Sequence, residues 1–258
     1  MENKKSNKGF IIIIILLIVI ILGLGTYIVY DKFIANNEPK KTEEKDNTTT
    51  TVETKESFLE DESKPIVYDD SSYTYLNVPY VNLKTITGTS LNKEIKDFVK
   101  NYEDTKEAIE NYKVDYKLYE NGDIVSVIMT GTTPGSTKYY YAFNLNKTNG
   151  NLVKNSELIK MKNINESDLG NKLLEVYENQ MNEPNYDLSM AKNTTVQSND
   201  QISIYDANKD IFNNTKLDDF DMYLNGSNQL IVVVKTYLYA GPDSNLYKFN
   251  LDTKLYEK

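Results

Sequence analysis

The sequence lacks three residue types that carry much of protein chemistry. Its 258 residues include no cysteine, no histidine and no arginine. The absence of cysteine excludes disulfides, thiolate nucleophiles and the lipid attachment of a lipoprotein. The absence of histidine removes the commonest general base and zinc ligand. Without arginine, no guanidinium can bind a phosphate or carboxylate in a bidentate manner. Most familiar hydrolase mechanisms are thereby excluded, and we expect no cofactor and no bound metal.

The sequence also has no long run of basic residues. Its formal net charge is −9, with 29 lysines against 38 acidic residues. Binding of nucleic acid needs a cationic surface that displaces counterions from the phosphates, so we expect no nucleic acid partner. An acidic chain attracts a basic protein or a cation more readily. The 21 tyrosines are expected mainly in the core and in strands, where their amphipathic rings pack well.

The longest apolar stretch is residues 10–30, FIIIIILLIVIILGLGTYIVY, which contains no charge. A helix of this length spans about 31 Å, which matches the hydrocarbon core of a bilayer. Lys4, Lys5 and Lys8 precede the run, so the positive-inside rule places the N-terminus in the cytoplasm. A cleaved signal peptide is the alternative, with 23–25 as its only candidate site, but the run is longer than a signal-peptide core. We therefore predict a single-pass protein of the cell membrane whose C-terminal part lies outside.

The remaining chain divides by composition into a linker and a domain. Residues 1–9 form a short cytoplasmic tail, and residues 31–65 are charged and threonine-rich, with too few apolar groups to fold. The folded domain is predicted at residues 66–258. Apolar residues at three- and four-residue steps predict amphipathic helices over 90–111, capped by Thr89 or Ser90, and over 166–182. Strands are predicted at 113–120, 124–130, 139–145, 202–205, 220–224, 230–239 and 246–251.

These elements indicate an α+β domain. The segment 113–145 forms a meander, its first two strands joined by a two-residue turn at Asn121-Gly122. The 73–83 stretch is rich in β-forming residues, but Pro79 restricts it to an edge strand or an extended entry segment. We expect one antiparallel sheet from this meander and the 220–251 strands, with the two amphipathic helices packed on its apolar faces.

One stretch resembles a metal site only in part. Residues 206–210, DANKD, start like a calcium-binding loop, in which alternate oxygens converge on one ion. Ile211 stands where the turn glycine belongs, and Leu217 stands where the bidentate glutamate belongs. An ordinary acidic turn is therefore the favoured interpretation, and the aspartates at 218, 219 and 221 are interpreted as a solvated approach to a strand.

The order of elements and several short motifs carry a resemblance to a known family. A helix and a hairpin are followed by the loop GTTPG at 131–135, the strand YYYAFNL, the turn NKTNGNLV and an amphipathic helix, and the late stretch 237–241 reads YLYAG. This succession resembles the extracytoplasmic domain of RsiV-type anti-sigma factors, which sense lysozyme, a domain that also accompanies some peptidoglycan deacetylases. The family's loop histidine is absent here, and no cytoplasmic anti-sigma segment precedes the apolar run.

The resemblance implies ligand contacts at two loops and suggests a partner. The residues it points to are Gly131, Thr132, Thr133, Gly135, Tyr237, Tyr239 and Gly241. It implies a membrane-anchored, non-catalytic binding or sensing domain outside the cell, for a cationic protein such as lysozyme or for the cell wall. The alternative is a surface hydrolase that acts on glycan through a carboxylate pair, which needs neither histidine nor cysteine. A groove lined by loops and tyrosines would favour binding, whereas two carboxylates across a cleft would favour the enzyme.

Overall fold

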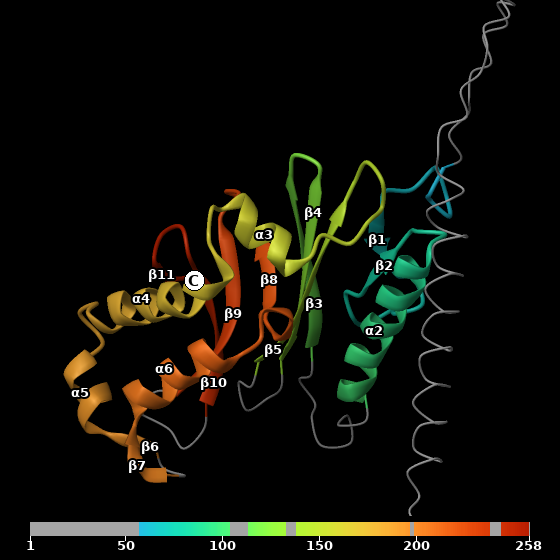
Figure 1. The fold of residues 1–258 in the computed structure, drawn as a ribbon. Helices are drawn as coiled ribbons and strands as arrows, with labels where there is room; N and C mark the ends of the chain where they lie inside the picture. Colours follow the sequence, from blue (N-terminus) through green and yellow to red (C-terminus); the bar gives the residue numbers. More distant parts are fainter. Residues whose placement is uncertain (1–56, 104–112, 133–137, 197–198, 238–243, 258) are drawn as a thin grey trace, which may run out of the picture. The chain divides into compact units, whose positions relative to one another are not determined.

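A computed structural model describes residues 57–103, 113–132, 138–196, 199–237 and 244–257. They form an α+β fold with antiparallel sheets, as expected from the sequence (Figure 1). The predicted apolar helix at 10–30 lies outside the described residues. Within them, no helix combines the length and the apolar character needed to cross a bilayer. The folded part includes residues 57–65, which the sequence assigned to the linker, because Phe58 and Leu59 pack against a buried cluster.

The first sheet is a three-stranded meander with a helix on one face. Its strands, in the order β3-β4-β5, are β3 (Lys113–Asn121), β4 (Ile124–Thr132) and β5 (Lys138–Asn146). The helix α2 (Ile86–Glu103) buries Leu91, Ile95 and Val99 in a cluster with the apolar residues of one sheet face. A small ladder of β1 (Val67–Asp69) and β2 (Pro79–Val81) completes this cluster. The meander predicted from alternating residues is confirmed.

The hairpin turn lies one residue later than the sequence suggested. Asn121 pairs with Ile124, so the two loop residues are Gly122 and Asp123. Gly122 has a φ of 58°, a left-handed conformation that glycine adopts without steric cost. Asn121 stays in the strand and donates its side-chain amide to the Asn225 carbonyl, 3.1 Å away. The prediction of an Asn121-Gly122 turn was therefore wrong in register.

The second sheet has four antiparallel strands in the order β11-β10-β9-β8. It consists of β8 (Asp221–Leu224), β9 (Leu230–Tyr237), β10 (Ser244–Asn250) and β11 (Leu255–Tyr256). The segment between the two sheets contains α3 (Asn155–Met161), η4 (Glu166–Asp168), α4 (Leu169–Met181), α5 (Leu188–Asn193), β6 (Thr195–Val196), β7 (Asn199–Ser203), α6 (Ile204–Asn214) and η5 (Leu217–Asp219).

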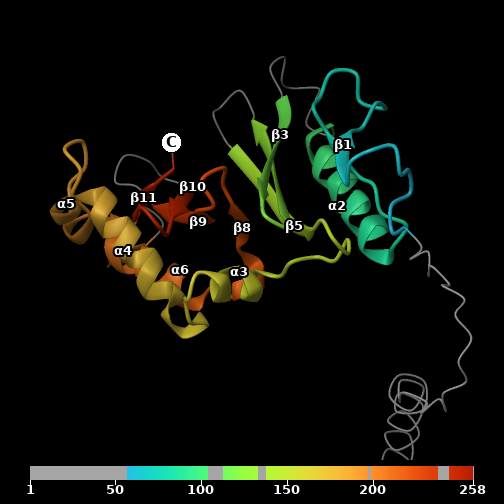
Figure 2. The same ribbon diagram turned by 90° about the horizontal axis from the view of Figure 1, so that it is seen from above.

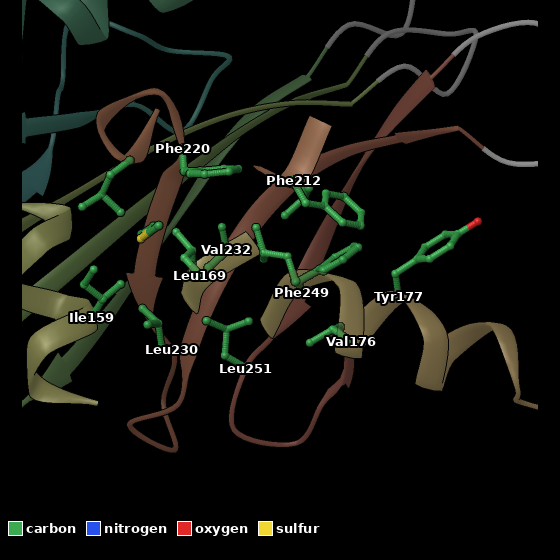
Figure 3. Packing of buried hydrophobic residues seen from close by; sticks show 14 of the residues in the cluster. Ile159, Leu169, Val176, Tyr177, Phe212, Phe220, Leu230, Val232, Phe249 and Leu251 are labelled. Carbon is green, nitrogen blue, oxygen red and sulfur yellow. The ribbon is translucent and has the colours of Figure 1, made fainter. Parts of the chain in front are cut away.

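The largest buried cluster lies between this sheet and the helices α4 and α6. Tyr177 and Val176 of α4 and Phe212 of α6 face Val232 and Phe249 of the strands (Figure 3). The Phe212 and Phe249 rings meet edge to face, with centroids 5.6 Å apart. Such aromatic pairs add about 0.5–1.5 kcal/mol beyond the burial of their area. The amphipathic helix predicted at 166–182 is confirmed as α4 and the short η4 before it.

Two helices differ from the sequence interpretation. The first begins at Ile86 rather than at 90, and Thr85 rather than Thr89 or Ser90 accepts a hydrogen bond from the first turn, from the Gly88 N–H at 3.3 Å. Its predicted end at 111 lies outside the described residues. The strand predicted at 202–205 exists as β7 but ends at Ser203, and α6 begins at Ile204, so the last two residues of that prediction were wrong. The acidic turn predicted at 206–210 was wrong, because these residues lie within α6.

The missed helix has a simple physical explanation. Ser203 caps α6 by accepting a hydrogen bond from the Asp206 N–H at 3.0 Å. The buried positions are Ile204, Asn208 and Phe212, at four-residue steps. Because the middle position is a buried asparagine, the sequence does not show apolar residues at regular helical spacing. The Asn208 amide donates to the Tyr237 carbonyl at 3.0 Å and accepts from the Tyr237 N–H at 2.7 Å, so both its nitrogen and its oxygen are paired at the end of β9.

The expected single sheet is divided in two, and buried side chains bridge the division between β5 and β8. Ser126 and Asn144 lie at its centre, 0% and 2% exposed. The Ser126 Oγ donates to the Asn144 Oδ1 at 2.6 Å and accepts from the Leu224 N–H at 3.1 Å. The Asn144 Nδ2 donates to the Met222 carbonyl at 2.8 Å. Side chains thus satisfy the backbone groups of β8 that a continuous ladder would have used. We call these residues, with Asp221, the seam.

Substitution of Asn144 by alanine tests the seam. It leaves the Met222 carbonyl and the Ser126 hydroxyl without their partner in a buried position, so we expect a loss of about 2–4 kcal/mol in the free energy of unfolding. The exposed Asn151→Ala change in the nearby turn serves as the control and should cost less than about 0.5 kcal/mol. Denaturant unfolding measures both, and equal effects of the two substitutions would contradict the role of the seam.

Candidate functional site

A groove runs between the free face of the first sheet and the strands β8 and β10 of the second. Its volume is about 750 Å³, within the range typical of ligand sites. Figures 1 and 2 show the strands that form its walls. The lining residues are Lys113, Asp115, Tyr116, Lys117, Tyr119, Ile128, Thr130, Thr132, Tyr140, Tyr223, Asn245, Leu246, Tyr247, Lys248 and Glu257.

Strand alternation explains why the first wall is polar. Successive residues of a strand point to opposite faces of the sheet. In β4, Val125, Val127 and Met129 therefore face the cluster beneath α2, whereas Ile128, Thr130 and Thr132 face the groove. In β3, Lys113, Asp115, Lys117 and Tyr119 face the groove in the same way, and Tyr116, which packs against the cluster beneath α2, also borders it because β3 is the outer strand of its sheet. One sheet thus carries a core face and a ligand-accessible face.

The floor of the groove is a small aromatic and apolar cluster. Ile128 and Tyr223 are buried in it together with Ile231 and Val233. The Tyr119 ring stacks on the Tyr223 ring, with centroids 5.8 Å apart and planes 9° apart. The other partly buried residues of this cluster are Tyr140, Ala142 and Leu246. The floor therefore offers amphipathic rings held in fixed positions.

Glu257 organises the electrostatics of the floor. The Tyr223 hydroxyl donates to Glu257 Oε2 at 2.6 Å, and the Lys248 Nζ lies 3.9 Å from the same oxygen. Burial, followed by the hydrogen bond to Glu257, raises the pKa of Tyr223 far above its ordinary value. Burial and the Glu257 charge also raise the pKa of Tyr119 and of Tyr140. These phenols stay neutral at physiological pH, so they act as hydrogen-bond groups and apolar surfaces rather than as bases.

The predicted contact residues are distributed over different environments. Thr132 lines the groove. Gly131 is buried at the end of β4, opposite Val114 and Tyr139, on the other face of the sheet. Tyr237 packs against the largest core cluster and does not line the groove. Thr133, Gly135, Tyr239 and Gly241 lie outside the described residues.

Sequence reasoning missed most of the groove. Tyr119, Tyr140, Tyr223, Tyr247 and Glu257 were not selected, although the alternation in β3 and β4 already separates a charged face from an apolar one. The sequence does not show which part of the second sheet lies opposite that charged face, and the groove cannot be predicted without this pairing. This pairing joins residues about a hundred positions apart, which no local pattern reveals.

A second cleft, of about 600 Å³, lies on the other side of β5, next to α2. It contains the carboxylates of Glu94, Asp218 and Asp221, with Tyr141 among them. The Tyr141 hydroxyl donates to Glu94 Oε2 at 2.5 Å. Burial, followed by the hydrogen bond to Glu94, raises the pKa of Tyr141 far above its ordinary value.

Asp221 links this cleft to the seam. Its Oδ1 accepts a hydrogen bond from the Ala142 N–H at 2.8 Å. Burial raises the pKa of Asp221 from 3.8 to about 6, and the Ala142 hydrogen bond only partly opposes this. The folded protein therefore holds the proton more tightly than the unfolded chain between about pH 4 and 6, so its stability falls as the pH rises through that window.

None of the described residues forms a group of acidic side chains suited to a metal ion. The 206–210 segment, considered as a calcium loop from the sequence, lies within α6. Its alternate carboxylates therefore do not converge as the oxygens of a loop would. The aspartates at 218 and 219 belong to the short η5 before β8.

The change Asp221→Asn tests the buried carboxylate. Asparagine keeps an oxygen for the Ala142 N–H and removes the buried charge, so at pH 7.5 we expect the variant to be more stable by about 1–3 kcal/mol. The difference should shrink towards zero at pH 4, where the aspartate is protonated. Asp218→Asn, an exposed residue of the same cleft, should show no such pH dependence. Unfolding at several pH values measures this, and a variant destabilised at pH 7.5 would contradict the assignment.

Comparison with known proteins gives no match for the chain. No family model matches it, and a search of the curated proteins finds none that matches. Function is therefore inferred from the residues of the groove.

Proposed function

We propose that the chain is a membrane-anchored, non-catalytic binding or sensing domain on the outer side of the cell membrane. Its ligand is a lysozyme-like protein or a component of the cell wall. The observation that carries this proposal is the groove, a cavity of ligand size lined by five tyrosines between two sheets. The apolar run at 10–30 supplies the membrane anchor in this proposal.

The chemistry of the groove supports binding rather than catalysis. Its buried phenols have raised pKa values, so they do not supply a base near neutral pH. The Glu257 carboxylate already accepts the Tyr223 hydroxyl and lies beside the Lys248 ammonium. Because these groups already pair with one another, they fix the shape of the groove and are poorly suited to act as an acid, a base or a nucleophile.

The second cleft is the observation that favours the alternative, a surface hydrolase. Glu94 and Asp221 line one cleft, and the pKa of Asp221 is raised to about 6, as a general acid requires. Asp221 also accepts a backbone hydrogen bond at the seam, which gives it a structural role. Release of reducing ends from purified cell wall, lost in both Glu94→Gln and Asp221→Asn, would establish the hydrolase. The absence of release would remove it.

Binding of lysozyme to the full chain in nanodiscs tests the proposed function. A specific partner should stay bound at 150 mM salt, where charges on the protein surface are screened beyond about 8 Å. An unrelated basic protein of similar charge should be released. Tyr140→Ala removes a ring from the groove floor and should weaken binding at least fivefold.

Tyr75→Ala is the matched control for this experiment, because Tyr75 is 96% exposed and does not line the groove. It should leave the affinity unchanged. Circular dichroism must show that both variants are folded. Equal binding of lysozyme and of the control protein, with release of both by salt, would contradict recognition of a lysozyme-like partner. Purified cell-wall fragments are then the remaining ligand to test in the same assay.

A further inference from the structure

The second wall of the groove is the edge of a strand rather than its face. Four consecutive residues of β10 line the groove, Asn245, Leu246, Tyr247 and Lys248. Side chains on one face of a strand alternate, so a face would contribute only every second residue. A consecutive run means that the groove borders the strand from the side, where backbone groups are also within reach.

This edge has no strand beside it among the described residues. β11 pairs only with Phe249 and Asn250, and one further bond joins the Glu257 N–H to the Lys248 carbonyl at 2.7 Å. On its other side, β10 pairs with β9 along its whole length, from Ser244 to Asn250. The half of β10 before Lys248 therefore ends the sheet. An unpaired strand edge is a template for an added strand.

The charge of the groove selects an acidic occupant. Lys113 and Lys117 are exposed on the opposite wall, and neither forms an ion pair within the described part of the chain. The groove is lined by the lysines Lys113, Lys117 and Lys248 and by the carboxylates of Asp115 and Glu257, of which Glu257 lies beside Lys248. The local excess is thus positive, although the whole chain carries a net charge of −9.

We propose that the groove binds an extended acidic peptide segment of a partner protein, which adds as a strand to residues 244–247 of β10. Its backbone pairs with the strand edge, its apolar side chains contact the tyrosine floor, and its carboxylates lie near Lys113 and Lys117. The inference rests on the proposed binding function, but it assigns to the groove an acidic peptide in place of a lysozyme-like protein or a wall component. Main-chain hydrogen bonds supply affinity in this mode, and side-chain contacts supply specificity.

The available edge distinguishes a peptide from the other candidate ligands. A glycan can stack on the tyrosines, but it has no backbone whose N–H and C=O groups follow the spacing of a β-strand. A folded protein surface needs about 800 Å² of contact per partner, and an edge recessed in a groove is reached more easily by a single extended chain.

A display library of random octapeptides, panned against the full chain in nanodiscs, tests this proposal. We expect enrichment of sequences in which acidic and apolar residues alternate. The best peptide, synthesised with a fluorophore, should bind at 150 mM salt, and Lys113→Glu and Lys117→Glu should each weaken it at least fivefold. Lys216→Glu, an exposed lysine that lines neither cleft, is the matched control and should have no effect.

Two further measurements show whether the peptide adds as a strand. Hydrogen exchange should slow at least tenfold, when the peptide binds, at those amides of residues 244–247 that point away from β9. The same peptide with alternate backbone nitrogens methylated along its pairing edge cannot donate to β10 and should lose at least tenfold in affinity.

Each result decides the matter. No enrichment, basic enriched sequences, or binding that is indifferent to methylation and to the lysine substitutions would overturn the inference. If lysozyme or wall fragments bind and slow hydrogen exchange in the groove while peptides do not bind, only the peptide proposal fails. If no ligand of any of these classes binds, the proposed binding function fails as well.

Discussion

Buried hydrogen bonds between side chains and backbone groups hold the two halves of this domain together. Ser126 and Asn144 provide the groups that the Leu224 N–H and the Met222 carbonyl need, and Asp221 accepts from Ala142. A backbone ladder between β5 and β8 would have continued one sheet into the next. Because side chains take the place of that ladder, β5 and β8 lie too far apart to pair, and they belong to two separate sheets.

The groove is a consequence of this division. Had the strands formed one continuous sheet, Tyr119 and Tyr140 would have shared a face with residues of β8 rather than facing Tyr223 and Leu246 in one cluster. Each sheet packs its other face against helices, α2 in the first and α4 with α6 in the second. The inner faces are therefore left to form a site, and their polar and aromatic residues have no core to fill beyond the small floor cluster.

Local patterns predicted most elements but not their assembly. The strands of the meander and α4 followed from alternation and from apolar residues at helical spacing, as in Leu173, Val176 and Tyr177. The helix α6 was missed because Asn208, a buried polar residue, occupies its apolar stripe. The groove was missed because its floor joins Tyr119 to Tyr223, which are distant in sequence. Of the predicted contact residues that the structure describes, Thr132 lines the groove. Its place at the end of β4 could be predicted from the pattern of that strand alone.

The separate cores have a mechanical consequence. Each sheet is fixed to its own helices by a buried cluster, and the two sheets are joined by the seam and by the floor cluster, in which Tyr119 stacks on Tyr223. A small rotation about the seam would move the outer ends of β3 and β10 much further than it moves Ser126 or Asn144. A change in the aperture between the walls would therefore have to slide the Tyr119 ring over the Tyr223 ring, whereas the clusters beside α2, α4 and α6 would keep their packing.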